Sequence, residues 1–206
     1  MCSSLLDREN EIKDFHLPRW EELPNIDLYL DQVICFLEKY LLNYVESDNE
    51  KESNAITKSM INNYVKHHVI NPPVNKKYNR EHLAYLFVIF ILKQVYSISD
   101  IKKLIQLAIE TSSVEQAYNQ FCLELEKAIE FTFQGNSYID QKELSQERYI
   151  LRNVVQTYAN KLYVLKVFLK KWKRENGDAL FFPMQIFPIQ KIGKFLIEKK
   201  GRPILN

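Results

Sequence analysis

The residues best suited to chemistry lie between positions 54 and 80, a stretch with five cations and no acid. Drawn as a helix at 100° per residue, positions 57–68 separate into an apolar arc and a polar arc. The polar arc consists of Lys58, Ser59, Asn62, Asn63, Lys66 and His67. Lysine pairs with phosphate, asparagine can bond adenine in the major groove, and serine can reach phosphate or bases. The arc therefore predicts a nucleic-acid surface, although an ordinary solvated helix face has the same composition.

A second basic group follows in a loop between two helices. The Asn71-Pro72-Pro73 step cannot continue a helix, because proline lacks an amide donor and restricts the residue before it. Lys76, Lys77 and Tyr78 come next. In this position they would act as a wing that touches the DNA backbone beside the major groove.

Other combinations of reactive residues do not suggest catalysis. His67 and His68 are adjacent, so on a helix they point about 100° apart and cannot bind one metal together. Glu124 and Glu126 are expected to face solvent. Cys35 and Cys122 lie among apolar helical residues and are expected to be inert core thiols. No phosphate-binding loop, dinucleotide fingerprint or nucleophile elbow occurs, so we expect no catalytic residue, no metal, no cofactor and no enzyme.

Composition favours a helical protein of the cytoplasm. Only four glycines occur among 206 residues, which argues against tight-turn β-architectures. No apolar run approaches the ~20 residues that span a bilayer, and we expect no secretory signal. The charge is uneven: residues 1–53 carry a net charge of −8 and residues 54–80 carry +5. Such asymmetry indicates a polyanionic partner or a contact between the acidic and basic parts.

Hydrophobic spacing and capping residues then predict the elements. We expect an irregular arm at 1–24, a solvated linker at 46–54, an extended apolar segment at 180–189, and helices at 25–45, 57–68, 80–95, from 97 onward, at 113–134 and at 141–175. The last helix carries a heptad seam from Leu151 to Trp172. The seam could form a homodimer, or its broad apolar stripe could pack inside its own chain.

Two resemblances refine this prediction. The predicted order is a basic helix, a short loop with Lys77-Tyr78, an apolar helix and the segment Ser97-Ile98-Ser99-Asp100-Ile101. This order resembles the second half of a MerR-type DNA-binding domain. A closer resemblance is carried by four segments: Leu17–Pro24, Leu28–Val33, Met60–Lys66 and Lys76–Tyr78. They resemble an uncharacterised bacterial family, DUF1836.

The resemblance implies an all-α protein with a MerR-like winged helix-turn-helix at 25–110, after the arm at 1–24 and before a helical bundle at 111–206. It also implies a transcriptional regulator that binds double-stranded DNA; no effector is implied. The alternative is a protein–protein interaction module that keeps the winged-helix shape, with its basic face docked on the acidic N-terminal arm.

Overall fold

The computed structural model describes residues 12, 15–42, 44–45, 56–136, 144–169 and 172. The chain divides into two compact units, Met1–Lys170 and Lys171–Asn206, and the elements below belong to the first. Their fold is mainly α-helical, which confirms the predicted class, with one small two-stranded sheet in addition. None of the described helices is long and apolar enough to cross a membrane. The predicted domain boundaries after residues 24 and 110 stay predictions.

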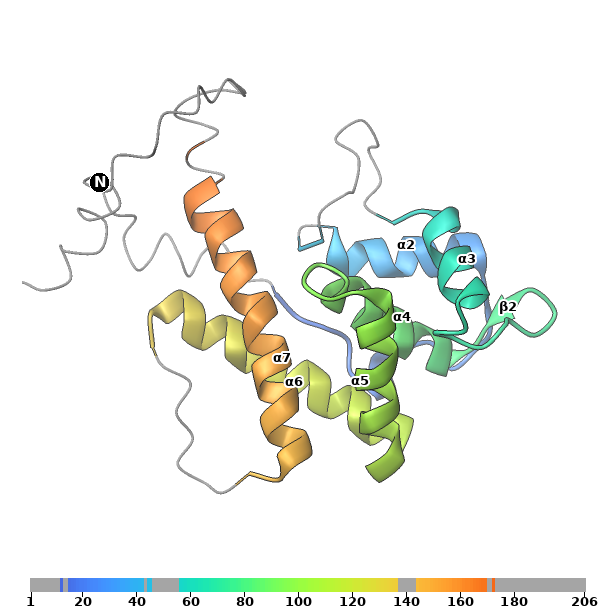
Figure 1. The fold of residues 1–206 in the computed structure, drawn as a ribbon. Helices are drawn as coiled ribbons and strands as arrows, with labels where there is room; N and C mark the ends of the chain where they lie inside the picture. The colour runs from blue at the N-terminus through green and yellow to red at the C-terminus, as the bar shows by residue number, and fades with distance from the viewer. Residues whose placement is uncertain are drawn as a thin grey trace, which may run out of the picture. The chain divides into compact units, whose positions relative to one another are not determined.

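The elements follow one another along the chain as drawn in Figure 1. In order they are η1 (Trp20–Glu22), β1 (Leu28–Tyr29), α2 (Leu30–Leu41), α3 (Lys58–Lys66), β2 (Lys77–Tyr78), α4 (Arg80–Leu92), α5 (Ile98–Thr111), α6 (Val114–Gln134), α7 (Gln146–Tyr163) and the π-helix η2 (Val164–Leu169).

The predicted helix starts at Thr57, Asn79 and Ser97 are confirmed by their N-caps. The Thr57 hydroxyl accepts a hydrogen bond from the Met60 N–H at 3.3 Å, and the other two side chains accept equivalent bonds. Such caps satisfy amide groups that the first helical turn leaves without partners. Gly135 ends α6 with φ 74°, a left-handed conformation that costs glycine little.

Several element boundaries differ from the predictions. The helix predicted at 25–45 begins only at Leu30, because Leu28 and Tyr29 form β1 and pair antiparallel with Tyr78 and Lys77 of β2. The helix predicted at 80–95 ends at Leu92. The helix predicted at 141–175 is α7 followed by the π-helical turn η2. The predicted linker at 46–54 and the apolar segment at 180–189 lie outside the described residues.

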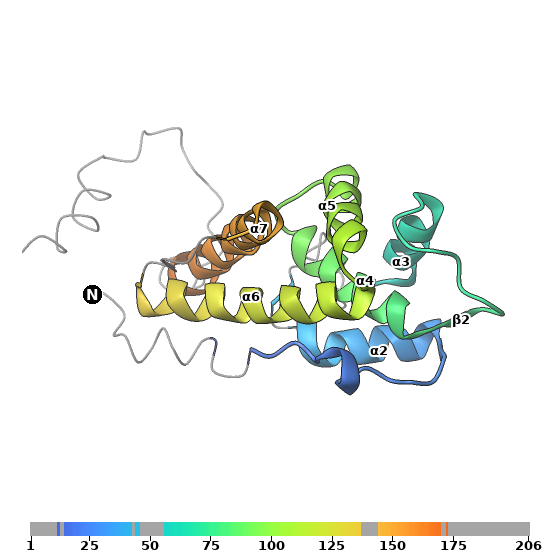
Figure 2. The same ribbon diagram turned by 90° about the horizontal axis from the view of Figure 1, so that it is seen from below.

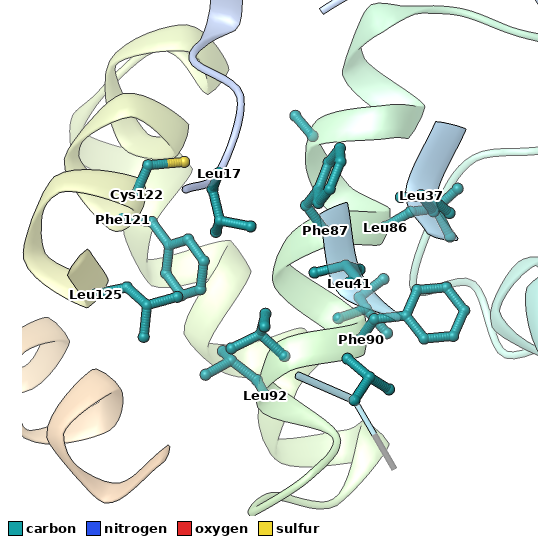
Figure 3. Packing of buried hydrophobic residues seen from close by; sticks show 14 of the residues in the cluster. Leu17, Leu37, Leu41, Leu86, Phe87, Phe90, Leu92, Phe121, Cys122 and Leu125 are labelled. Atoms are coloured by element: carbon teal, nitrogen blue, oxygen red, sulfur yellow. The ribbon is translucent and has the colours of Figure 1, made fainter. Parts of the chain in front are cut away.

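The core is built around α4, which is buried on nearly all sides. Leu86, Phe87 and Phe90 are each at most 1% exposed. Figure 3 shows Leu37 and Leu41 of α2 close to these side chains, with Phe121, Cys122 and Leu125 of α6 on the other side of Phe87. A helix that is apolar all round must be covered all round, so α4 is the shared centre of the N-terminal helices and of α6.

The α6–α7 pair forms the other packing layer. Figure 2 shows α5 and α7 on the same side of α6, with α2 on the opposite side. From the predicted heptad seam, Val155, Tyr158 and Leu162 are buried in this fold. The middle of the seam therefore packs inside its own chain, as the broad apolar stripe allowed. Homodimerisation stays a prediction.

Candidate functional site

Helix α3 is held in one orientation by its apolar side. Ile61 and Tyr64 are buried, and the Tyr64 ring meets the Phe90 ring of α4 edge-on, with centroids 5.6 Å apart. The Thr57 cap fixes the start of the helix. A short helix anchored in this way can present a defined row of side chains on its other side.

That other side presents the predicted polar arc to solvent. Its members are all exposed: Lys58, Ser59, Asn62, Asn63, Lys66 and His67. The helix ends at Lys66 rather than at His68, with His67 as its C-cap. His68, which the sequence predicted as part of this helix, has left it with φ 53°.

One carboxylate borders this face. Asp31, in the first turn of α2, places Oδ1 2.6 Å from Lys58 Nζ. Both side chains are largely exposed, so the pair contributes little to stability. The exposed face of α3 has no acid of its own, but Asp31 of α2 lies at its border. A helical wheel of α3 could not show this neighbour.

The loop before α4 forms a tight hairpin turn at Val74–Lys77. Asn75 and Lys76 have φ of 51° and 62°, and the Lys77 N–H donates to the Val74 carbonyl at 2.9 Å. Positive φ at both central positions is the geometry of a type I′ turn, which matches the twist of paired strands. The scarcity of glycine argued against such turns, but here asparagine and lysine supply the left-handed residues.

The cations around the hairpin have different surroundings. Lys76 is exposed, and the half-buried Lys77 lies with Nζ 5.1 Å from the centroid of the Tyr29 ring. Arg80 lies over the Trp20 ring and donates to the Pro24 carbonyl. Tyr78, which was predicted to lie in the wing with Lys76 and Lys77, is buried instead, and burial raises its pKa. Tyr78 therefore belongs to the core.

His82 closes the root of the hairpin, a role that the sequence did not indicate. Its Nδ1 accepts from the Asn79 N–H at 3.1 Å, and its Nε2 lies 3.1 Å from the Asn71 carbonyl. The two bonds connect Asn71, in the loop that follows α3, to the start of α4.

The described part of the acidic arm, residues 15–24, packs on α6. Glu126 accepts bonds from the Leu17 N–H at 3.1 Å and from Arg19 Nη1 at 3.0 Å. The Trp20 N–H donates to the Asn119 side chain at 2.8 Å. The expectation that Glu126 faces solvent was therefore wrong, because a segment more than 100 positions away in the sequence covers it.

Two other expectations about reactive side chains also change. Glu124 is 2% exposed and lies 3.4 Å from Arg148 Nη2 and 3.8 Å from Arg152 Nε. Cys35 is exposed, because α2 turns Val33, Leu37 and Leu41 inward and leaves position 35 on its outer side. Cys122 is buried as predicted, and burial raises the pKa of its thiol to about 12. Among the described residues, no three His, Cys, Asp or Glu side chains are grouped to hold a metal ion.

Comparison with known proteins gives a family. The family described as "Domain of unknown function (DUF1836)" matches residues 18–121, half of the chain. This range contains α2, α3, the hairpin, α4 and α5. No curated protein and no solved structure matches the chain.

Proposed function

We propose that this chain, which belongs to the DUF1836 family, is a cytoplasmic transcriptional regulator that binds double-stranded DNA through a MerR-like winged helix-turn-helix. The observation that carries the proposal is the solvent face of α3. It presents only lysine, asparagine, serine and histidine, while the opposite face anchors the helix in the core.

In this proposal α3 lies in the major groove. Lys58, Asn62 and Lys66 follow one another at intervals of four, so they form one row about 12 Å long at 1.5 Å per residue. Ser59, Asn63 and His67 form the row beside it. The lysines would neutralise phosphates at the groove edges, and the asparagines would read base edges between them.

The hairpin would serve as the wing. Figures 1 and 2 both show it projecting at the same end of the fold as α3. Lys76 at its tip and Lys77 beside it supply two more cations for the backbone. The succession of α3, hairpin, buried α4, and α5 starting at Ser97 is the order that the MerR resemblance implies. Pairing of β1 with β2 and the His82 bonds hold the hairpin relative to α4.

The test is a fluorescence-anisotropy titration of the full chain with duplex DNA over a salt series. Four lysines reach the surface, Lys58, Lys66, Lys76 and Lys77, and at about −0.9 per phosphate contact the log–log salt slope should be about −3.6. Lys66→Gln should reduce the slope by about 0.9. The matched control is Lys127→Gln on the exposed side of α6, which should leave the slope unchanged. Absence of binding at low salt would refute the proposal.

The alternative is a protein–protein interaction module, and exposed apolar side chains near the hairpin favour it. Ile26, Tyr29 and Val74 are 66%, 55% and 70% exposed. Exposed apolar residues that gather in one place mark interaction sites more often than scattered ones do. This function predicts no DNA binding at any salt concentration, so the same titration separates the two.

A further inference from the structure

A cavity of about 470 Å³ lies among α4, α5, α6 and α7, away from the α3 face. Apolar side chains from all four helices line it, among them Val88, Leu104, Ala108, Phe121, Leu151 and Val154. Sites for small molecules typically have about 300–1,000 Å³ and mostly apolar walls with a few polar groups. The cavity meets both criteria.

The packing of α5 shows that the apolar walls are incompletely covered. Of its apolar residues Ile101 is buried, whereas Leu104, Ile105 and Ala108 remain half-buried and Ile109 is 40% exposed. An amphipathic helix normally buries its apolar stripe against neighbours. The half-buried residues all line the cavity, so an apolar occupant would complete the cover of α5.

Polar groups gather on the cavity wall where α6 and α7 begin. Gln116 in the first turn of α6 and Arg148 in the first turn of α7 both line it. The Arg148 side chain is half-exposed, and its Nη2 contacts Glu124 at 3.4 Å. A guanidinium carries five N–H donors, so Arg148 can also bind an anion in the cavity. The N-termini of both helices add partial positive charge.

One acid also lines this wall, but it is directed to its own helix. The pKa of Glu147 is lowered by a hydrogen bond from its own backbone N–H and by one from Ser145. These are the bonds of a carboxylate that caps the start of α7. The positive groups that an occupant meets are Arg148 and the two helix N-termini, beside the charged Glu147 carboxylate.

We propose that this cavity binds a small amphipathic molecule with an apolar body and a single anionic head, such as a medium-chain carboxylate. The body lies against α4, α5 and α7, and the head contacts Arg148. This site is separate from the proposed DNA surface, and the proposal holds whether or not the chain binds DNA.

The test is calorimetric titration of the full chain with three probes that share a ten-carbon chain: decanoate, decanol and decyltrimethylammonium. One decanoate should bind per chain. Decanol should bind about tenfold more weakly, because it lacks a charge-assisted hydrogen bond to the guanidinium. The cation should bind more weakly still.

Two variants test the location of the probe. Ala108→Trp fills the cavity and should weaken decanoate binding by at least about tenfold, because the cavity loses the space for the chain. Gln106→Trp, which places a tryptophan on the exposed side of α5, should leave binding unchanged. Arg148→Gln should bring decanoate to the affinity of decanol, and Arg148→Lys should restore part of the difference.

Several results would overturn the proposal. Binding of none of the probes excludes the site, and equal decanoate affinity in wild type and Ala108→Trp places the probe elsewhere. A preference for the cation refutes the anionic head. If Ala108→Trp fails to fold by circular dichroism, the comparison of decanoate with decanol in Arg148→Gln decides, since an unchanged preference would exclude the contact with Arg148.

Discussion

Asp31 gives the sharpest test of the α3 surface, because its carboxylate borders the face that would meet DNA. In the free protein Asp31 holds Lys58 at 2.6 Å, with both side chains more than half exposed. On binding, Lys58 must exchange this carboxylate for a phosphate, and Asp31 then remains beside the DNA backbone. Asp31→Asn removes both the competition for Lys58 and the repulsion between the Asp31 carboxylate and the DNA phosphates.

The size of the effect follows from elementary electrostatics. In water, a carboxylate about 6 Å from a phosphate repels it by about 0.7 kcal/mol. With one or two phosphates at that distance, Asp31→Asn should tighten DNA binding about three- to tenfold at low salt. The log–log salt slope should stay near the wild-type value, because Lys58 contacts phosphate in both proteins. The fold should be nearly unaffected, since an exposed ion pair contributes about 0–1 kcal/mol.

The assay is an anisotropy titration between about 50 and 300 mM salt, in which counterion release is measured directly. Glu130→Gln changes the net charge equally but lies on the exposed side of α6, so it should leave affinity nearly unchanged. In a Lys58→Gln background, where no lysine is left to compete for, adding Asp31→Asn should tighten binding only by the part that comes from relieved repulsion. If Asp31→Asn weakens binding, or if Glu130→Gln tightens binding as much, α3 is not the DNA surface.

Three further predictions concern stability. Glu124→Ala should lower the free energy of unfolding by about 3 kcal/mol in urea titrations, because Arg152, whose side chain is 11% exposed, loses this carboxylate, whereas Glu130→Ala on the same helix should change it by less than about 0.5 kcal/mol. Gly135→Ala should cost about 1 kcal/mol in the same titrations, because alanine is strained at φ 74°; no loss would mean that the α6 end rearranges. Glu22 accepts a backbone N–H that lowers its pKa below 4.5, so its contribution is present above that pH and disappears as pH falls through the lowered pKa. Glu22→Gln should therefore lower the thermal midpoint slightly at pH 7, and this loss should shrink as the pH falls through the lowered pKa; a loss that is the same at every pH would contradict the assignment.

The sequence predicted well what is decided locally. Helix starts at Thr57, Asn79 and Ser97 depend on a side chain that reaches an amide three residues later, and the structure confirms all three. The division of α3 into a buried and an exposed face also depends on one helical period. His68 is the exception. It follows the end of α3, where the helical period no longer applies.

What the sequence missed comes from contacts between distant segments. The β1–β2 pair joins positions about 50 residues apart and shortened the first predicted helix. Glu124 is buried because Arg148 and Arg152 of α7 meet it, and no spacing within α6 could show this. Asp31 reached the α3 face in the same way, through the packing of α2. A helical wheel sorts residues on one helix, but it does not say which neighbour completes the surface.

The construction of α3 separates its stability from its proposed function. Ile61 and Tyr64 hold the helix through apolar burial and the ring contact with Phe90, whereas Asn62 and Lys66 are exposed. Exposed positions outside caps and ion pairs usually change stability by no more than about 0.5 kcal/mol. A loss of DNA binding in Asn62 or Lys66 variants would therefore report on recognition, because the platform beneath them does not depend on those side chains.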